Sequence, residues 1–377
     1  MLPSTKPAIY LDYAAGMPFS DDLLERIRRY HREFVVNPHG GSCYAEYCRR
    51  AIINAEARLL ACVGSSPDEA SVIWTSGGTE ALNLAIQGFA CGPEQEIHCE
   101  AGAHAAMLAP FHARLTRGQP GRILPLAPQG QVILDLQHPP ALLALSHVNN
   151  ETGAIQDLAA CRHQVFGKNT TLLVDAAQSL GKCPIPWQAA SIDLLALSAR
   201  KIGGPPAVGA LIVRRDHAPA PQILGGGQQR GMRSGTVDTI GAVLFADAAE
   251  MACAAMLELR RQHQVLSRRL LDGLQRLGRY RCRVLSPPTA APHITMIAFE
   301  GYEGAVIMRL LAEKEQILVG TGSACSAESK DISHILKAMA VPETLARGAI
   351  RVSLGPPTTA RDIDALLAAL ERVLARY

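Results

Sequence analysis

Thr171-Leu172-Leu173-Val174-Asp175 is an apolar run that ends in an acid, and Gln178 follows three residues later. Similar apolar runs, each flanked by turn residues, lie at Ser71–Trp74, Ala141–Ser146, Ile192–Leu197 and Val208–Val213. Their length and continuous hydrophobicity are typical of buried strands in a parallel sheet. Helical patterns, such as those at Glu80–Phe89 and His104–Leu115, fall between the runs. The alternation predicts an α/β fold with a mostly parallel sheet that is covered by helices.

The pattern changes after Gly225-Gly226-Gly227. Residues 240–277 are compatible with one long helix and contain no strand signal. Strand-like segments follow at His293–Phe299 and Ala349–Ser353, with helical segments at 303–314 and 360–375. We therefore expect a large domain over residues 14–250 and a smaller α/β domain formed by residues 1–13 and 251–377.

The composition excludes several classes of protein. The 377 residues are 48% hydrophobic and 19% charged, which indicates a soluble globular protein rather than a disordered one. The net charge of +3 is too small to argue for binding to nucleic acid or to a membrane. No signal peptide is visible at the N-terminus. The ten cysteines include no Cys-x-x-Cys pair, which disfavours a zinc or thioredoxin site and fits a reducing cytoplasm. We expect no metal site.

Polar residues stand where strands are predicted to end. Asp175 ends one strand and Lys201 follows another, in the order Ser198-Ala199-Arg200-Lys201. Strand ends of this kind line the ligand crevice of open α/β sheets. An aspartate there can hold the ring nitrogen of pyridoxal 5'-phosphate (PLP), and a lysine can form its Schiff base. The alternatives are a helix N-cap for Asp175, since Asp-Ala-Ala-Gln also fits a cap, and an ordinary surface lysine for Lys201.

A glycine turn precedes the first predicted helix of the sheet. Ser76-Gly77-Gly78-Thr79 follows a predicted strand, so free N–H groups at the helix start can bind a phosphate. On its own this motif is more often an ordinary strand–helix turn.

Two further polar residues have both a functional and an ordinary interpretation. The flat ring of His104 can stack on a cofactor, but most histidines in proteins are surface or core residues without such a role. Asn150 can donate to a cofactor or to a carboxylate, or serve as a turn residue.

The C-terminal part of the chain supplies a thiol and a cation. Cys325 lies among small residues, between Gly320-Thr321-Gly322-Ser323-Ala324 and Ser326-Ala327, which suggests an exposed loop. An exposed thiol can approach a substrate, which a buried thiol cannot. The alternative interpretation is that Cys325 is a free surface cysteine without a function. Arg351 lies in a strand-like segment and can bind a carboxylate through two parallel donors.

With these residues in place, the chain resembles the NifS/Isc-type cysteine desulfurases among the class V aminotransferase-like PLP enzymes. The resemblance covers nearly the whole chain. It rests on Tyr10-Leu11-Asp12-Tyr13, Asn37-Pro38, Ser76-Gly77-Gly78-Thr79-Glu80, His147-Val148-Asn149-Asn150-Glu151-Thr152-Gly153, Val174-Asp175-Ala176-Ala177-Gln178-Ser179, Arg233-Ser234-Gly235-Thr236, Gly322-Ser323-Ala324-Cys325 and Ile350-Arg351-Val352-Ser353-Leu354-Gly355. The Gly-Ser-Ala-Cys form is similar to the first subgroup of the family. The implied fold is the PLP-dependent transferase fold of the aspartate aminotransferase type.

The resemblance also implies roles for single residues. It makes Lys201 the Schiff-base lysine and proton carrier, and Cys325 the nucleophile that takes the substrate sulfur as a persulfide. The implied cofactor contacts are Asp175, Gln178, His104, Gly78, Thr79, Ser198 and Asn150, with Thr236 contributed across a homodimer. Arg351 and Asn150 would hold the carboxylate of L-cysteine, and alanine would leave.

The chain departs from the family pattern at a few positions. Arg200 stands where the family has a histidine before the lysine, and we expect Arg200 to bond the cofactor phosphate or a neighbouring acid. Ser42 and Cys43 stand where a histidine usually follows the Asn-Pro motif. The chain also stops soon after its last predicted helix, without the longer tail through which housekeeping members dock an iron–sulfur scaffold. The sulfur-acceptor protein is therefore left open.

The activity expected from these features is conversion of L-cysteine to L-alanine with the sulfur kept on Cys325. One alternative is a selenocysteine lyase or another class V PLP enzyme, such as an aminotransferase, which needs no thiol. Another is a weakly active PLP-fold protein kept as a binding partner of sulfur-carrying proteins, which the departures at Arg200 and Cys43 favour.

Overall fold

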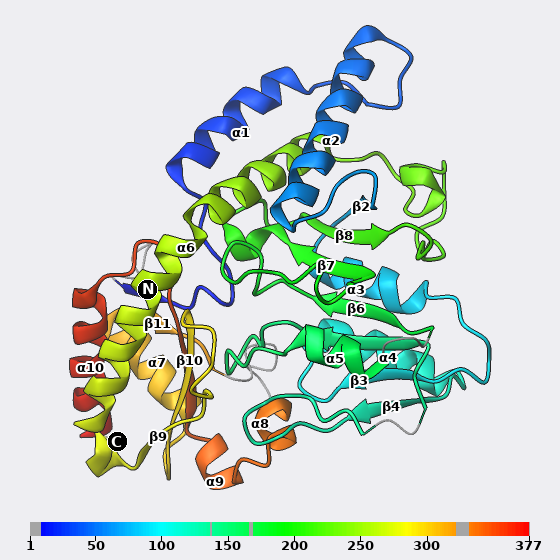
Figure 1. Ribbon diagram of the computed structural model, residues 1–377. Helices are drawn as coiled ribbons and strands as arrows, with labels where there is room; N and C mark the ends of the chain where they lie inside the picture. Colours follow the sequence, from blue (N-terminus) through cyan, green and yellow to red (C-terminus); the bar gives the residue numbers. More distant parts are fainter. Residues whose placement is uncertain (1–8, 136–137, 166–168, 322–331, 377) are drawn as a thin grey trace.

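The largest part of the fold is a seven-stranded sheet, seen in Figure 1. The structure is a computed structural model that describes residues 9–135, 138–165, 169–321 and 332–376. The strand order is β2-β8-β7-β6-β5-β3-β4. The strands are β2 (Ala70–Thr75), β3 (Ile97–Glu100), β4 (Gly121–Leu124), β5 (Leu142–Ser146), β6 (Thr171–Asp175), β7 (Leu194–Ser198) and β8 (Gly209–Arg214).

The sheet is mostly parallel, as the sequence predicts, with one exception. Strands β3 to β7 pair in parallel, whereas β8 runs antiparallel to both of its neighbours, β2 and β7. The prediction that Val208–Val213 is a parallel strand is therefore wrong. The connection from Ser198 to Gly209 contains only the short 3-10 helix η1 (Ala199–Ile202) and a turn, which is too short for the crossover that a parallel neighbour requires.

Helices cover both faces of this sheet. Successive side chains of each strand point to opposite faces, and both faces are apolar. In β6, Leu172 and Val174 join one core and Leu173 joins the other. Helices α3 (Gly78–Gln87) and α4 (Ala105–Thr116) close the second of these cores. The first core is closed by α1 (Asp21–Glu33), α2 (Cys43–Cys62), α5 (Leu158–Val165) and the first half of α6 (Thr239–Gln275).

A second, smaller layer has its own core. Strands β9 (Cys282–Val284), β10 (Ile294–Phe299) and β12 (Ala349–Ser353) form an antiparallel sheet, and β1 (Ile9–Leu11) pairs in parallel with β11 (Ile317–Val319). Helices α7 (Gly304–Glu315), α10 (Ala360–Leu374) and the second half of α6 pack on them. The short helices α8 (His334–Ala338) and α9 (Glu343–Ala346) lie before β12.

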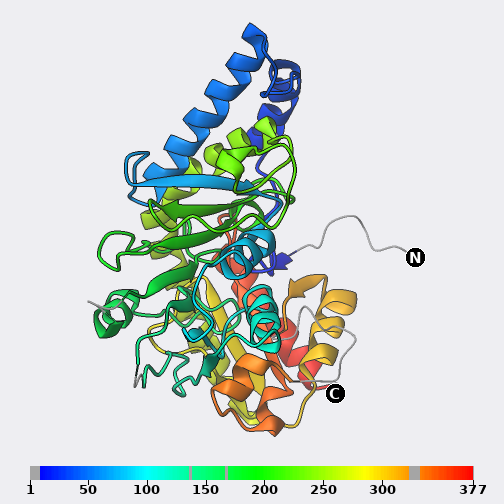
Figure 2. The ribbon, with the colours of Figure 1, turned by 90° about the vertical axis from the view of Figure 1, so that its right-hand side faces the viewer.

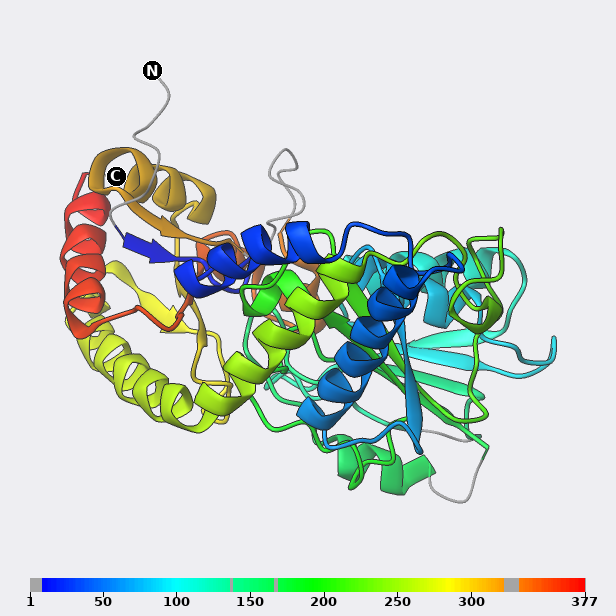
Figure 3. The same cartoon turned by 90° about the horizontal axis from the view of Figure 1, so that it is seen from above.

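Helix α6 connects the two layers, as Figure 3 shows from above. It is continuous over 37 residues, and the division expected at residue 250 falls inside it. Ala246 and Ala249 belong to the core of the large sheet, while Leu266 and Leu270 belong to the core of the small layer. By length and apolar composition alone α6 could cross a membrane, but these buried residues make it a core helix.

A buried acid joins the first two helices to α6. Asp247 is 2% exposed and accepts hydrogen bonds from Tyr30 of α1 (Oη–Oδ2, 2.8 Å) and from Arg58 of α2, and it pairs with Arg26 (3.0 Å). The two guanidinium groups hold the pKa of Asp247 below its usual value, against the effect of its burial. The network fixes α2 against α6 while the far end of α2 extends beyond the sheet (Figure 2).

Candidate active site

A cavity of about 680 Å³ opens at the carboxyl ends of β5, β6 and β7. This is the edge at which open α/β sheets bind ligands. The residues expected to act together line this one cavity: Gly78, Thr79, His104, Asn150, Asp175, Gln178, Ser198, Lys201 and Arg351. Residues from both layers therefore form its wall, since Arg351 comes from the small layer and the others from the large one.

Lys201 reaches the cavity from the 3-10 helix that follows β7. Its Nζ donates hydrogen bonds to the carbonyl oxygens of Ala14 (2.8 Å) and Ala15 (2.9 Å), on the segment that connects β1 to α1. Burial, with the nearby charge of Arg351, lowers the pKa of Lys201 to about 8, and the charge of Asp175 opposes this only in part. The amine is thus partly neutral near physiological pH, as a nucleophilic lysine must be.

Asp175 lies at the end of β6, directly across from Ser146 of β5. Its Oδ1 accepts a hydrogen bond from the N–H of Ala177 (2.9 Å). Burial raises the pKa of the carboxyl, while the charges of His104 and Lys201 oppose this. A carboxylate in such a place needs a cationic partner.

Gln178 is held in place on both sides of its amide. Its Nε2 donates to the carbonyl oxygen of Ala14 (2.8 Å), and its Oε1 accepts from Lys182 Nζ (3.1 Å). Burial lowers the pKa of Lys182 to about 7. Ala14 therefore accepts from both Lys201 and Gln178, which ties the two side chains to one carbonyl group.

The turn before α3 offers an anion site. Gly77, the N-cap of α3, has φ 151°, a conformation that favours glycine, and it has no side chain with which to cap the first N–H groups of the helix. A Cβ at Gly78 would stand 3.4 Å from Ser198 Cβ, so the helix start and the end of β7 lie side by side. Glu80 fixes the turn, because it accepts from the N–H of Ser76 (2.7 Å) and from Arg233 (2.8 Å).

Arg351 enters from β12 and is 3% exposed. Its Nη1 donates to the carbonyl oxygen of Asn150 (2.7 Å), and its Nη2 pairs with Asp12 Oδ1 (2.7 Å). Its Nε is buried without a hydrogen-bond partner among the described residues. A buried donor of this kind is costly unless a ligand pairs with it.

His104 is the N-cap of α4, and its Nδ1 accepts from the N–H of Ala106 (3.1 Å). Burial lowers the pKa of the ring, so a neutral imidazole faces the cavity. Glu151, which also lines the cavity, accepts a hydrogen bond from Ser333, and burial raises the pKa of Glu151 to about 7. His334 of α8 bonds through its Nε2 to the carbonyl oxygen of Ala103 (2.9 Å), which ties α8 to the segment before His104.

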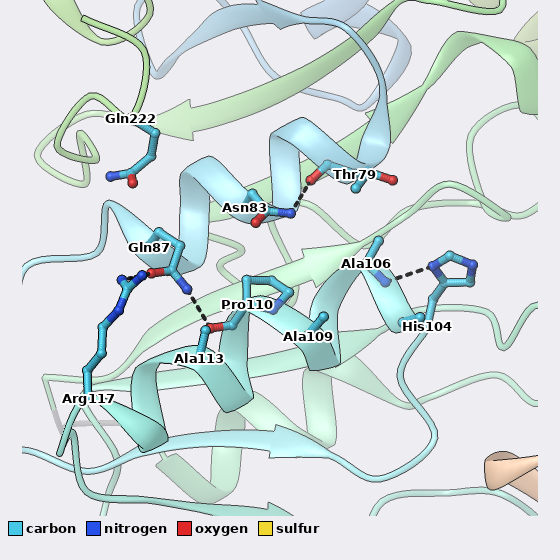
Figure 4. Close-up of a pocket in the computed structure, with 11 residues that line it drawn as sticks. Thr79, Asn83, Gln87, His104, Ala106, Ala109, Pro110, Ala113, Arg117 and Gln222 are labelled. Atoms are coloured by element: carbon cyan, nitrogen blue, oxygen red, sulfur yellow. Dashed lines mark hydrogen bonds between the residues drawn. The ribbon is translucent and has the colours of Figure 1, made fainter. Parts of the chain in front are cut away.

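A shallow groove continues from the cavity between α3 and α4, as Figure 4 shows. Thr79 and His104 lie where the groove and the cavity meet. On the α4 side the groove is lined by the small side chains of Ala109 and Ala113. Arg117 lies at the far end, where its Nη1 donates to Gln87 Oε1 (2.8 Å). The groove gives the cavity an open side along the large sheet.

Two of the expected site residues do not line the cavity, and a third lies outside the described residues. Arg200 is exposed and its side chain lies against Gly16, so its contact with a phosphate stays a prediction. Thr236 is exposed and does not line the cavity of its own chain, and its contribution across a dimer also stays a prediction. Cys325 lies outside the described residues.

Some residues of the site carry no assigned role in the sequence reasoning. Asp12, which pairs with Arg351, has a recognisable signal, because it is an acid that directly follows the short apolar run Ile9-Tyr10-Leu11. Glu151 lies in the segment His147-Val148-Asn149-Asn150-Glu151, where nothing in the sequence indicates that this acid is buried. The carbonyl groups of Ala14 and Ala15 carry no sequence signal, because any residue supplies a carbonyl.

The donor set fits PLP. The uncapped start of α3 and Ser198 suit a phosphate, the cavity-facing Asp175 suits a protonated ring nitrogen, and a lysine whose pKa is about 8 suits a carbonyl carbon. The Nε of Arg351, which has no partner within the described part of the chain, suits a substrate carboxylate.

The comparisons with known proteins agree with this geometry. The family described as aminotransferase class-V matches residues 9–366. A cysteine desulfurase of Sinorhizobium fredii is 34% identical over 98% of this chain and 97% of its own length, and the cysteine desulfurase IscS of Dictyoglomus turgidum is 32% identical over 98% and 95%. A solved NifS-like protein superimposes with a TM-score of 0.89 at 28% identity, covering 98% of this chain and all of its own. The expected PLP-dependent transferase fold is confirmed. The chain belongs to the class V aminotransferase family and, within it, to the NifS/Isc-type cysteine desulfurases.

Proposed function

We propose that the protein is a PLP-dependent cysteine desulfurase that converts L-cysteine to L-alanine and keeps the sulfur as a persulfide on Cys325. The observation that carries the proposal is the single cavity in which Lys201, Asp175 and Arg351 converge below the start of α3. The relatives named as cysteine desulfurases, which match nearly the whole chain, support the same activity.

The cofactor would be held by side chains and N–H groups of the large sheet. The first turn of α3 and Ser198 would take its phosphate, Asp175 its ring nitrogen, and Gln178 and Asn150 its ring oxygen. Bound there, PLP supplies an electron sink for the bonds at the α-carbon of the substrate. Lys201 is the base that can move a proton at that carbon, because its pKa of about 8 leaves a useful fraction neutral.

The substrate would be positioned by Arg351. Its Nε has no hydrogen-bond partner among the residues that the structure describes, and its Nη1 and Nη2 are held by Asn150 and Asp12, so the guanidinium is fixed before substrate arrives. A carboxylate that pairs with this guanidinium places the α-carbon of a small amino acid near Lys201. Cys325 would then take the sulfur, since a thiolate is a strong nucleophile and its persulfide can be passed on.

We further propose that the active protein is a homodimer in the cytoplasm. The exposed position of Thr236 and the open groove beside Thr79 support a contribution from the partner to the phosphate site. Large exposed apolar side chains such as Tyr44 (70% exposed) and Leu224 (80%) support a further protein contact. The persulfide would pass to an acceptor protein, and the IscS names of several relatives favour iron–sulfur cluster assembly as its pathway.

An assay of the purified protein tests the proposal. With L-cysteine it should form alanine, and a persulfide should appear on Cys325 in mass spectra. L-Selenocysteine and an α-keto acid should be offered in parallel. A strong preference for selenocysteine would favour a lyase, amino transfer to the keto acid would favour an aminotransferase, and no turnover with any of them would leave a binding role.

A further inference from the structure

Two cysteines meet where α2 ends against the middle of α6. Cys62 is the last residue of α2, and Cys253 lies one turn beyond Glu250 on α6. The two helices are fixed to each other directly beside this point, because Arg58 of α2 pairs with both Asp247 and Glu250 of α6. Figure 1 shows α2 lying along the first half of α6.

The two cysteines are in contact. The Sγ of Cys253 donates to the carbonyl oxygen of Cys62 at 3.7 Å, and each thiol shifts the pKa of the other. The carbonyl of Cys62 is available because it lies in the last turn of a helix, where intrahelical donors run out. A thiol this close to the backbone of the second cysteine is within the range from which a small side-chain rotation can form a disulfide.

The two thiols influence each other's ionisation. The neighbouring Cys62 lowers the pKa of Cys253, and Cys253 together with burial raises the pKa of Cys62. The coupling therefore favours the state in which one thiol of the pair is ionised and the other stays protonated. Both are partly exposed, so a small oxidant can reach them.

We propose that Cys62 and Cys253 form a redox-responsive pair that closes into a disulfide between α2 and α6 when the protein meets a peroxide. The Cys253 thiolate attacks the O–O bond of hydrogen peroxide, an S–O bond forms, and hydroxide leaves and takes up a proton to become water. The Cys62 sulfur then attacks Cys253 Sγ, an S–S bond forms, and the hydroxyl group leaves as a second water with the proton of Cys62. The two thiols lose two electrons and the peroxide gains them.

The pair lies outside the cavity and away from the start of α2. Neither cysteine lines the cavity. Tyr44, near the start of α2, is roughly 27 Å from Cys62 along the helix, so a partner bound at that end leaves the thiols accessible. The disulfide would close a long loop of chain and should therefore raise thermal stability.

The test treats the PLP-loaded enzyme with increasing hydrogen peroxide in the absence of L-cysteine. Remaining thiols are alkylated, and peptides are mapped by mass spectrometry without reduction. We expect a peptide pair joined through Cys62 and Cys253, a midpoint of thermal unfolding that rises by a few degrees, and reversal of both by dithiothreitol. Cys253→Ser and Cys62→Ser should each abolish both effects, whereas the matched variant Cys282→Ser should keep them.

The proposal is overturned if Cys62 and Cys253 are recovered as free thiols or as separate sulfinic acids at a peroxide dose that oxidises Cys325. It is also overturned if either of them joins a different cysteine in most of the protein. Because no L-cysteine is present, the outcome is separate from that of the desulfurase assay.

Discussion

Replacement of Arg351 by methionine tests the substrate site most sharply. The variant keeps a long side chain but removes the guanidinium that donates to Asn150 and pairs with Asp12. A hydrogen bond between charged groups contributes about 1.5–3 kcal/mol. At about 1.4 kcal/mol per factor of ten, the KM for L-cysteine should rise about tenfold to a hundredfold. The PLP content, read from the absorbance of the cofactor, should not change.

The same replacement also has a structural cost. Asp12 is 15% exposed and would lose its partner, and removal of one member of a buried pair costs about 3–5 kcal/mol. The double variant Asp12→Asn/Arg351→Met removes the stranded charge. It should recover most of the free energy of unfolding, measured in urea, while the KM stays high. Asp12→Asn alone should leave the KM at or below the wild-type value.

Two results would contradict the role of Arg351 in binding the substrate carboxylate. If the double variant recovers both the stability and the KM, then Arg351 acts only through the fold. If Arg351→Met loses PLP in proportion to its activity, the residue supports the cofactor rather than the substrate.

Three further outcomes follow from the cavity. Borohydride reduction of the purified protein should leave a pyridoxyl group on Lys201 in peptide maps, and an adduct on another lysine would contradict the assignment. The rate at which the apoprotein takes up PLP should increase with pH through about 8, because burial lowers the pKa of Lys201 to that value and only the neutral amine reacts; a rate that is flat from pH 7 to pH 9 would contradict this. Arg200→Ala should weaken PLP affinity about tenfold or more, since a hydrogen bond to a charged group contributes about 1.5–3 kcal/mol, and an unchanged affinity would show that the side chain, which lies against Gly16, does not reach the phosphate.

Much of the fold could be predicted because its strands are continuous apolar runs. Ala349–Ser353 forms a strand over the predicted residues, and the helix predicted over 240–277 is α6. The short strands β3 and β4 are harder to predict, since four residues give no clear period and β4 is partly exposed. The direction of β8 depends on the length of its connection to β7 rather than on its own sequence.

The site could be predicted where side chains carry the chemistry. Asp175 and Lys201 stand at strand ends, and a sequence shows such positions directly. The backbone contacts of Lys201 with Ala14 and Ala15 depend on how the first residues pass from the small layer to the large one. The pairing of Arg351 with Asp12 joins residues that are far apart in the chain and adjacent only through the fold.

The fate of the sulfur atom tests the proposed function most directly. The PLP-loaded protein should be mixed with one equivalent of L-cysteine, and alanine and protein-bound persulfide should be measured over a single turnover. The account predicts equal amounts of both, with the additional sulfur on Cys325, and it predicts that Cys325→Ser retains the colour of PLP but forms no persulfide. If Cys325→Ser releases alanine and free sulfide at the rate of the unaltered protein, the proposed sulfur transfer is contradicted.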